Sequence, residues 1–232
     1  MRGQFIITGV STGIGYALAQ AALQAGWAVQ GVGRHSPEGL LEHPEMTFTK
    51  ADLMDPMACE KVEFKTAESG PTVLVNNAGT IGPIGRAGDS TGEEITSTML
   101  LNVVAPMRLT ARFLSEVVGQ KAVYFTGSGA ASYPIEGWSA YCASKAAIHQ
   151  FAEVLSKEYP EVPVHAFRPG KVDTPMQRAI REAGEGSFPS HDHFVEEFEM
   201  GRLVSPSVVA DNILKSLDHE GELPVVFSLT EL

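Results

Sequence analysis

Short apolar runs alternate along the chain with longer stretches in which apolar residues recur every three or four positions. The short runs predict buried strands at residues 5–7, 27–33, 46–49, 72–75, 121–126, 162–168 and 224–227. The longer stretches predict helices at residues 16–26, 55–68, 95–118, 141–158 and 206–218. A β–α alternation without a repeat or a linker is typical of a parallel sheet with helices on both faces. The pattern therefore predicts one doubly wound α/β domain over residues 1–232, with about seven parallel strands.

The alternation changes at residues 176–205. Two short helical patterns, 176–183 and 191–199, surround a glycine-rich loop and follow the carboxyl end of the sixth predicted strand. A segment in that position can cover a bound ligand, so we expect a substrate lid at about 176–205. His191, Asp192 and His193 do not predict a metal site here, because side chains two residues apart diverge on a helix.

Composition narrows the classes of partner. The chain has 232 residues, 44% of them hydrophobic and 19% charged, which is ordinary for a soluble globular protein. Its formal charge is −11 with no cluster of Lys or Arg, which disfavours nucleic acid and anionic membrane as partners. No apolar stretch approaches the ~20 residues of a membrane span, and the N-terminal apolar run is too short for a signal peptide. Two cysteines argue against a disulfide framework, so a cytoplasmic location is expected.

A glycine-rich turn follows the first predicted strand and opens the first predicted helix. Its order is Thr8-Gly9-Val10-Ser11-Thr12-Gly13-Ile14-Gly15, a G-x-x-x-G-x-G spacing. A strand, a glycine turn and a helix N-terminus form a site for a pyrophosphate, since backbone N–H groups point at the anion. The alternative is a glycine-rich turn with no ligand.

The second predicted strand ends in Gly33, and Arg34 follows it. An NAD site usually has an acidic residue here for the ribose 2′-hydroxyl, yet no Asp or Glu lies between Gly15 and Glu38. Arg34, with His35 as a helper, instead suits a 2′-phosphate, which predicts NADPH as cofactor. The alternative is a solvated arginine at a strand end.

The stretch from Ser128 to Lys145 carries the candidate chemistry. Tyr141 and Lys145 are four residues apart in an Ala-rich helical pattern, which places both side chains on one face. An adjacent ammonium favours the phenolate and lowers the tyrosine pKa toward a useful range. Ser128 supplies a hydroxyl for a substrate oxygen. Asn102 lies in an otherwise apolar helical face, either as a functional amide or as a core amide bonded to backbone.

Together these motifs resemble the short-chain dehydrogenase/reductase family, which has a Rossmann fold, and the likeness runs through nearly the whole chain. The resemblance implies that Asn102, Ser128, Tyr141 and Lys145 form a catalytic tetrad. Asn76-Asn77-Ala78-Gly79 resembles the motif that braces the central sheet, and Pro169-Gly170 resembles the loop that contacts the nicotinamide. The implied cofactor-binding residues are Gly9, Ser11, Thr12, Gly13, Ile14, Gly15, Arg34, His35, Asp52, Leu53, Asn76, Asn77, Ala78, Gly79, Tyr141, Lys145, Pro169, Gly170, Val172 and Thr174.

The family resemblance also implies roles for the tetrad. Tyr141 would give a proton to the developing alkoxide, and Ser128 would hold the same oxygen. Lys145 would bind the nicotinamide ribose and lower the pKa of Tyr141. Asn102 would anchor a water that links Lys145 to solvent.

Three segments, TIGPIG, GWSAYCASKAA and PGKVDTPMQ, resemble the benzil reductase and sepiapterin reductase-like branch of the family, which reduces ketones and diketones with NADPH. The expected function is therefore an NADPH-dependent carbonyl reductase. The alternatives are an NAD-dependent alcohol dehydrogenase of the same family and a non-catalytic dinucleotide sensor. A small-molecule carbonyl substrate is expected, in a pocket shaped by Ser128, Ile135, Trp138 and Met176, with the loop 82–85 beside them.

The sequence departs from the family pattern at two places. The stretch between Asp52 and Thr72 is short, which trims one helix beside the sheet. No Gly-Gly lies near the C-terminus, where many relatives use it in subunit packing. A homodimer is therefore expected, with a tetramer possible.

Overall fold

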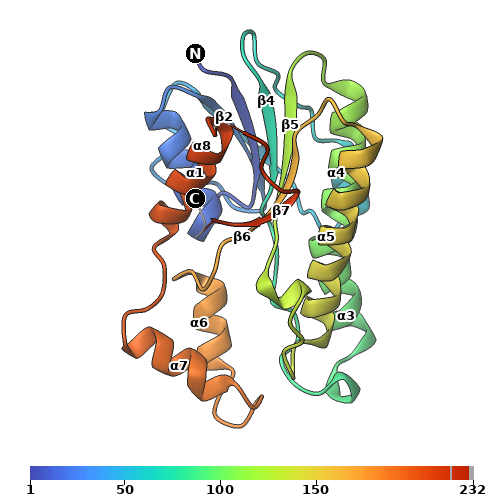
Figure 1. The fold of residues 1–232 in the computed structure, drawn as a ribbon, viewed down its shortest axis with the longest axis vertical. Coiled ribbons are helices and arrows are strands. Elements are labelled where there is room, and N and C mark those ends of the chain that lie inside the picture. The colour runs from blue at the N-terminus through green and yellow to red at the C-terminus, as the bar shows by residue number, and fades with distance from the viewer. Residues whose placement is uncertain (220, 230–232) are drawn as a thin grey trace.

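Seven parallel strands form one sheet at the centre of the molecule, in a computed structural model that describes residues 1–219 and 221–229 (Figure 1). The strands lie in the order β3-β2-β1-β4-β5-β6-β7. They are β1 (Gln4–Thr8), β2 (Ala28–Gly33), β3 (Met46–Lys50), β4 (Thr72–Asn76), β5 (Lys121–Thr126), β6 (Val164–Arg168) and β7 (Val226–Ser228). The predicted doubly wound α/β architecture is confirmed.

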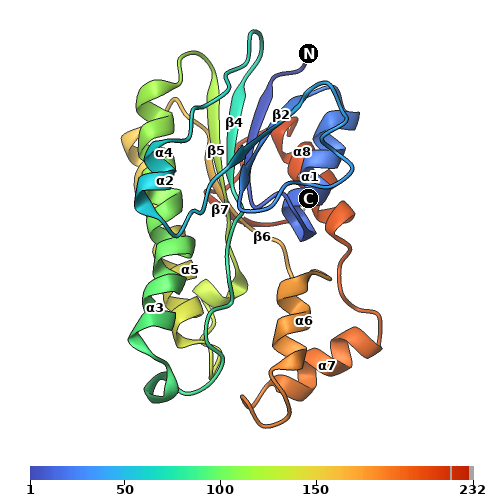
Figure 2. The same cartoon turned by 180° about the vertical axis from the view of Figure 1, so that it is seen from behind.

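Helices cover both faces of the sheet, as Figures 1 and 2 show from opposite sides. The α-helices are α1 (Gly13–Gln24), α2 (Pro56–Glu60), α3 (Gly92–Met99), α4 (Ala105–Glu116), α5 (Ser139–Glu158), α6 (Pro175–Glu182), α7 (His191–Glu199) and α8 (Pro206–Leu217). The shorter helical segments are η1 (Ala87–Asp89), η2 (Leu100–Val104) and η3 (Gly129–Ala131). Helices α1 and α8 pack together on one face, while α2, α4 and α5 lie on the other. None of the helices described is long and apolar enough to cross a bilayer.

Alternate residues of the central strands belong to two separate cores. Phe5 and Ile7 of β1 pack in the core beneath α1 and α8, whereas Ile6 between them packs in the core beneath α4 and α5. All three are fully buried. A period of two is what the pleat imposes, and a strand buried on both faces is apolar at every position. This is why the strands appear in the sequence as continuous apolar runs.

The order of the strands reverses between β1 and β4. The chain passes from β1 through β2 to the edge strand β3, then returns to pair β4 with the other side of β1. Loops that leave the carboxyl ends of β1 and β4 therefore diverge to opposite faces and open a crevice between them. This is the point in the fold where a ligand is expected.

The predicted helix at residues 55–68 is wrong beyond its first turns. Helix α2 ends at Glu60, and the chain that follows is held by Gln30 of β2. The Gln30 amide donates to the carbonyl of Glu63 (2.8 Å) and accepts from the N–H of Lys65 (2.8 Å). A buried side chain thus satisfies backbone groups that a longer helix would have bonded internally, so the segment stays extended.

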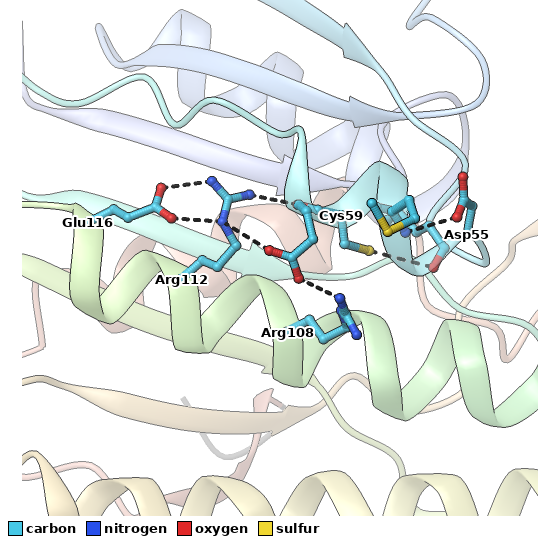
Figure 3. A network of polar contacts seen from close by, with 8 residues as sticks. Asp55, Cys59, Arg108, Arg112 and Glu116 are labelled. Atoms are coloured by element: carbon cyan, nitrogen blue, oxygen red, sulfur yellow. Dashed lines mark hydrogen bonds and ion pairs between the residues drawn. The ribbon is translucent and has the colours of Figure 1, made fainter.

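Helix α2 is fastened to α4 by two arginines (Figure 3). Arg112 donates to the carbonyl of Cys59 (2.7 Å) and pairs with Glu116 (2.7 Å). Arg108 pairs with Glu60. Asp55 caps the N-terminus of α2 by accepting the N–H of Met57 (2.9 Å). These polar contacts hold a helix that is too short to be stable through its own hydrogen bonds.

The predicted helix at residues 95–118 is interrupted. It begins earlier, at Gly92, where Thr91 and Glu94 form a capping box. The turns between α3 and α4 form a π-helical segment, Leu100–Val104, which contains Asn102. One residue more per turn changes which side chains face inward, and such bulges are frequent at functional sites.

Candidate functional site

The glycine-rich loop between β1 and α1 fits an anion. Gly9 and Gly13 have φ of 72° and 59°, a region that favours glycine. A Cβ on Gly15 would lie 2.1 Å from the carbonyl oxygen of Gly9, so only glycine allows this close packing. Thr12, the N-cap of α1, makes no side-chain cap bond. The free N–H groups of the first turn therefore suit the pyrophosphate of a dinucleotide.

Hydrogen bonds connect the carboxyl ends of β1, β4 and β5 at the crevice. The hydroxyl oxygen of Thr8 accepts from the backbone N–H groups of Asn77 (2.9 Å) and Ala78 (3.0 Å). The Asn77 amide donates to the carbonyls of Thr8 and Gly9, and it accepts from the Thr126 hydroxyl (3.2 Å). The loops after β1, β4 and β5 are thereby fixed relative to one another.

A cavity of about 660 Å³ runs along this edge from the glycine-rich loop to α6. Most of the residues predicted for the site line it. They are Gly9, Ser11, Thr12, Gly13, Ile14, Arg34, His35, Asp52, Leu53, Asn77, Ala78, Gly79, Ser128, Ile135, Trp138, Tyr141, Lys145, Pro169, Gly170, Val172, Thr174 and Met176. Residues from separate loops and helices along the whole chain thus converge on one space.

Gly15, Asn76 and Asn102 do not line the cavity but lie behind its wall. The Asn76 amide donates to the Thr110 hydroxyl (3.1 Å). Asn102 accepts from the N–H of Thr80 (2.9 Å) and donates to the Thr80 carbonyl (2.8 Å) and the Ser144 hydroxyl (3.1 Å). The Asn102 side chain is therefore a satisfied core amide that holds the loop after β4.

Ser128, Tyr141 and Lys145 come together in the middle of the cavity. Lys145 donates to the carbonyl of Thr126 (2.8 Å), and its Nζ lies 5.6 Å from the ring centroid of Tyr141. The Ser128 side chain is hydrogen-bonded to Tyr141, and its Oγ accepts from the N–H of Ala130 (3.1 Å). One hydroxyl, one phenol and one ammonium therefore line the same space, and Tyr141 and Lys145 share one face of α5, as their spacing predicts.

Burial sets the protonation states of this group. It raises the pKa of Tyr141, and the hydrogen bond from Ser128 lowers that pKa only in part. Burial also lowers the pKa of Lys145 from 10.5 to about 8. The net effect of these surroundings on the tyrosine pKa is an increase, and the lowering of that pKa by Lys145 stays a prediction. The phenol stays protonated at neutral pH, which is the form that donates a proton.

His149 is a residue that the sequence did not single out. It lies on the same face of α5 as Tyr141 and Lys145, one further turn along, and it is 8% exposed. Its Nε2 accepts from the backbone N–H of Ser128 (3.4 Å). Burial and the charges of Lys145 and Arg168 lower the pKa of His149 to about 4, so the ring is a neutral acceptor. The spacing of Tyr141, Lys145 and His149, each four residues after the last on one helix, could have identified His149 from the sequence.

The far end of the cavity is apolar and aromatic. Ile135, Trp138 and Met176 line it as predicted, and Ile81, Ile180 and Phe194 line it as well. The Trp138 ring lies 5.0 Å from Phe194, 5.6 Å from Phe188 and 5.9 Å from Tyr141, measured between centroids. Helices α6 and α7, from the predicted lid, supply one wall.

The loop 82–85 does not line this cavity, which corrects its predicted part in the substrate pocket. Gly82 instead packs against Thr98 of α3, and Gly85 borders a second cavity of about 510 Å³ beside the lid.

In the lid, the ring of His191 is hydrogen-bonded to the Arg181 carbonyl (2.9 Å). The described part of the chain holds no group of three or more His, Cys, Asp or Glu placed to bind a metal.

The opposite end of the cavity is polar. Arg34 and His35 after β2, and Asp52 and Leu53 after β3, line it. Arg34 is exposed and makes no ion pair with any residue that the structure describes. A cation is thus available where the ribose of an adenosine moiety is expected from the position of the glycine-rich loop.

The fold and this cavity agree with the comparison to known families. A family model described as "short chain dehydrogenase" matches residues 4–185. The chain belongs to the short-chain dehydrogenase family. It is therefore an NAD(P)-dependent oxidoreductase.

Individual members of this family are similar over most of the chain. Benzil reductase ((S)-benzoin forming) from Bacillus subtilis is 34% identical over 241 residues, which covers 98% of each protein. Sepiapterin reductase from Xenopus tropicalis is 31% identical over 163 residues, or 67% of this chain and 62% of that protein. A short-chain dehydrogenase/reductase of known structure from Saccharomyces cerevisiae, YIR035C, superposes with a TM-score of 0.86 at 24% identity, covering 97% and 95% of the two chains. The chain thus falls in the predicted benzil and sepiapterin reductase branch.

Proposed function

We propose that this protein is an NADPH-dependent carbonyl reductase that converts a ketone or diketone to an alcohol, with Tyr141 as the general acid. The observation that carries the proposal is the convergence of Ser128, Tyr141 and Lys145 in one cavity with the glycine-rich loop. The likeness to a benzil reductase over 98% of the chain supports the substrate class.

The residues present suit a nicotinamide dinucleotide. The loop Gly9–Gly13 and the N-terminus of α1 would hold the pyrophosphate, and Lys145 would hold the nicotinamide ribose. When bound, the reduced nicotinamide supplies the hydride. Asn77, Pro169 and Thr174 line the cavity between these two points and would fix the direction of the cofactor.

The protein's own part in the reaction is to move a proton. Tyr141 is kept protonated by burial, which raises its pKa, so its hydroxyl donates to the substrate oxygen as negative charge develops there. Ser128, hydrogen-bonded to Tyr141, donates to the same oxygen and stabilises it. The aromatic wall around Trp138 excludes water from the developing charge. General acid catalysis of this kind contributes ~10²–10⁴-fold to the rate.

Arg34 supports NADPH rather than NADH. Its guanidinium makes no ion pair with the described residues and lies just after β2, at a position where NAD enzymes of this architecture carry an acid. A guanidinium forms strong bidentate bonds with a phosphate. Arg34 would therefore bind the 2′-phosphate of NADPH, with His35 beside it.

The test is a substrate panel of ketones, diketones and pterins, with the loss of NADPH absorbance as the measurement. Diketones should be reduced most rapidly. Tyr141→Phe should abolish the signal, which excludes a contaminating reductase. No oxidation of NADPH with any carbonyl would overturn the proposal.

Two alternatives give different results in the same experiment. An NAD-dependent alcohol dehydrogenase would oxidise alcohols with NAD⁺ faster than it reduces ketones with NADPH. A non-catalytic sensor would bind the dinucleotide without turnover. The intact Tyr141 and Lys145, both turned to the cavity, favour the enzyme over the sensor.

We further propose a cytoplasmic homodimer. Cys59 and Cys142 are both free thiols, which suits a reducing compartment. Met107 of α4 and Val154 of α5 are 39% and 41% exposed on neighbouring helices, and they would be covered by a second copy. Light scattering after size exclusion tests the dimer, and a monomer mass would contradict it.

A further inference from the structure

Lys171 connects the loop after β6 with helix α7 of the lid. Its Nζ donates to Nε2 of His193 (2.6 Å) and to a carboxylate oxygen of Glu197 (3.0 Å). An ammonium has no acceptor, so the imidazole nitrogen is the acceptor in the first of these bonds. The same Nζ lies 5.7 Å from the ring centroid of Phe194, the residue after His193 on the helix. One side chain thus contacts three residues of α7, although it belongs to a different segment of the chain.

The backbone at Lys171 is fixed where the two ends of the lid meet. Its carbonyl accepts from the N–H of Val204 (2.8 Å), and the N–H of Asp173 donates to the carbonyl of Val204 (2.9 Å). Val172, between them, forms a parallel bridge with Val204. Figures 1 and 2 show α6 and α7 beyond the ends of the strands, between the chain that leaves β6 and the chain that enters α8. Backbone bonds therefore fix the two ends of the lid, and side-chain contacts fix the position of α7.

Glu197 is a carboxylate shared by two cations, and its side chain is only 13% exposed. Its second oxygen lies 3.1 Å from a guanidinium nitrogen of Arg202. Hydrogen bonds from Lys171 and Arg202 hold the pKa of the Glu197 carboxyl below its usual range, so it is charged at neutral pH. A single exposed ion pair contributes little, whereas several charges in a network contribute more. Of the two cations, Lys171 is the one that lines the cavity.

Phe194 extends this connection to the reacting group. Its ring lies 5.0 Å from Trp138, and Trp138 lies 5.9 Å from Tyr141, measured between centroids. The three rings are buried in one apolar cluster, and all three line the cavity. An apolar wall beside the phenol keeps water from the charge that develops on a substrate oxygen. A contact that fixes α7 therefore also fixes the part of this wall that the lid supplies.

We propose that Lys171 is a positioning residue, which binds His193 and Glu197 and so holds α7 where it closes the substrate end of the cavity. This rests on the proposed function, because the closed wall serves the reduction of a carbonyl compound. It adds a role for His193 and Glu197, neither of which lines the cavity. Loss of the connection should leave the phenol in place and weaken the binding of the carbonyl compound.

The first measurement is the steady-state reduction of a diketone by the full chain with saturating NADPH. Lys171→Met has a side chain of similar length without the ammonium. It should raise the KM for the diketone roughly three- to tenfold, as expected for loss of one ion pair and one cation–π contact. Glu197→Gln should raise that KM about two- to fivefold, as expected for loss of the ion pair alone. The kcat and the Kd for NADPH should stay within about twofold in both variants.

Three further variants test whether the effect belongs to this connection. Lys171→Arg should restore most of the affinity, because a guanidinium also binds a carboxylate and an aromatic face. Lys171→Met combined with Glu197→Gln should be no worse than Lys171→Met alone, since both substitutions break one connection. Arg202→Met is the matched control, because it removes the other cation from the same carboxylate and does not touch the cavity. It should change the KM by less than about twofold.

The second measurement does not depend on turnover. In a Trp27→Phe background Trp138 is the one tryptophan of the chain, and Trp27 belongs to the core beneath α1 and α8. Acrylamide should quench Trp138 about twofold more strongly in Lys171→Met and in Glu197→Gln, because α7 uncovers the ring for part of the time. Arg202→Met should leave the quenching unchanged.

Three results would overturn the inference. A weaker Kd for NADPH in Lys171→Met but not in Glu197→Gln would place the ammonium on the cofactor. A raised KM in Lys171→Met with an ordinary KM in Glu197→Gln would place the ammonium on the substrate. An unchanged KM in both variants would leave the network without a part in the reaction. If the unmodified protein reduces no carbonyl compound, the proposed function fails, and stronger quenching in both variants would still support the connection between Lys171 and α7, whereas equal quenching would refute it.

Discussion

The ammonium of Lys145 donates a 2.8 Å hydrogen bond to the backbone carbonyl of Thr126, the last residue of β5. The lysine is 5% exposed, and no carboxylate pairs with it in the part of the chain that the structure describes. A buried cation held by one carbonyl is a poor arrangement for stability. Lys145 lies at the cavity beside Tyr141, so we infer that the loss of stability from burying its charge is retained for function.

Lys145→Met should therefore stabilise the cofactor-free protein at pH 7 while it removes activity. Burial lowers the lysine pKa from 10.5 to about 8, so charge in the folded state is disfavoured. We expect a gain of about 1–3 kcal/mol, or roughly 2–4 °C in Tm per kcal/mol for a chain of this size. Thermal unfolding and NADPH binding measure the two effects, and NADPH affinity should fall.

The pH dependence of that gain has a definite sign. Between pH 8 and 10.5, the two pKa values of Lys145, the unfolded chain binds more protons than the folded protein, so the unmodified protein becomes more stable as pH rises. The Met variant has no such group, and the difference in free energy of unfolding should shrink across this window. Lys157→Met, which changes an exposed lysine on the same helix, is the control. A difference that is constant with pH would contradict the assignment.

Tyr141→Phe should cut kcat by at least ~10²-fold, because the phenol hydroxyl is the proton donor. The Kd for NADPH should stay within about twofold, since the ring and its contact with Trp138 are kept. Steady-state kinetics and nucleotide fluorescence test this. Tyr159→Phe, at the other end of α5, is the matched control. An ordinary kcat in Tyr141→Phe would remove the tyrosine from the mechanism.

Gly127 and His149 should behave as a coupled pair. A Cβ on Gly127 would lie 2.4 Å from Nε2 of His149, which holds the N–H of Ser128. Gly127→Ala should thus displace Ser128 and lower both kcat and Tm. His149→Ala opens the space, so the double variant should recover part of the Tm. Recovery is partial because the carbonyl of Phe167 lies 3.0 Å from the same Cβ position.

A double-mutant cycle in the free energy of unfolding measures this coupling, and we expect about 1–2 kcal/mol. Additive effects would show that the two residues act independently.

The buried, neutral ring of His149 should make the protein less stable in acid. Its pKa is about 4 when folded and 6.5 when exposed, so stability attributable to the neutral ring falls as pH drops through 6.5 toward 4. His149→Gln should show a smaller decline across that window.

The strands and most helices could be predicted because their signals are local. Continuous apolar runs report burial on both faces, and apolar residues every three or four positions mark the helices, although α1 and α6 begin at Gly13 and Pro175, before the predicted residues 16 and 176. The site residues were predicted for a similar reason. Chemistry in this architecture sits at the carboxyl ends of strands, and Asn77 and Ser128 follow β4 and β5 closely.

What the sequence did not reveal depends on contacts between distant segments. The extended chain after α2 is fixed by Gln30, 33 residues before Glu63 and on another strand. The π-helical turn at Asn102 depends on bonds to Thr80 and Ser144, which are not its sequence neighbours. The raised pKa of Tyr141 depends on burial by Trp138 and its aromatic neighbours, which spacing along α5 does not report.

Cofactor choice should depend on Arg34. A charge-assisted hydrogen bond is worth ~1.5–3 kcal/mol, so Arg34→Ala should raise the KM for NADPH roughly ten- to hundred-fold and leave that for NADH almost unchanged. Comparable kcat/KM for the two cofactors in the unmodified protein would make Arg34 an ordinary surface arginine.

Gly33→Asp should have the opposite effect on NADH. The position accepts a side chain, because a Cβ on Gly33 would lie 3.8 Å from its nearest neighbour, the backbone nitrogen of Gly9, and the backbone is not left-handed. A carboxylate there would repel the 2′-phosphate of NADPH and accept from the ribose hydroxyl of NADH. The KM for NADPH should rise while that for NADH falls. General damage to the site would raise both values, so opposite signs identify a contact with the phosphate. Parallel increases in both KM values would contradict this placement of the adenosine ribose.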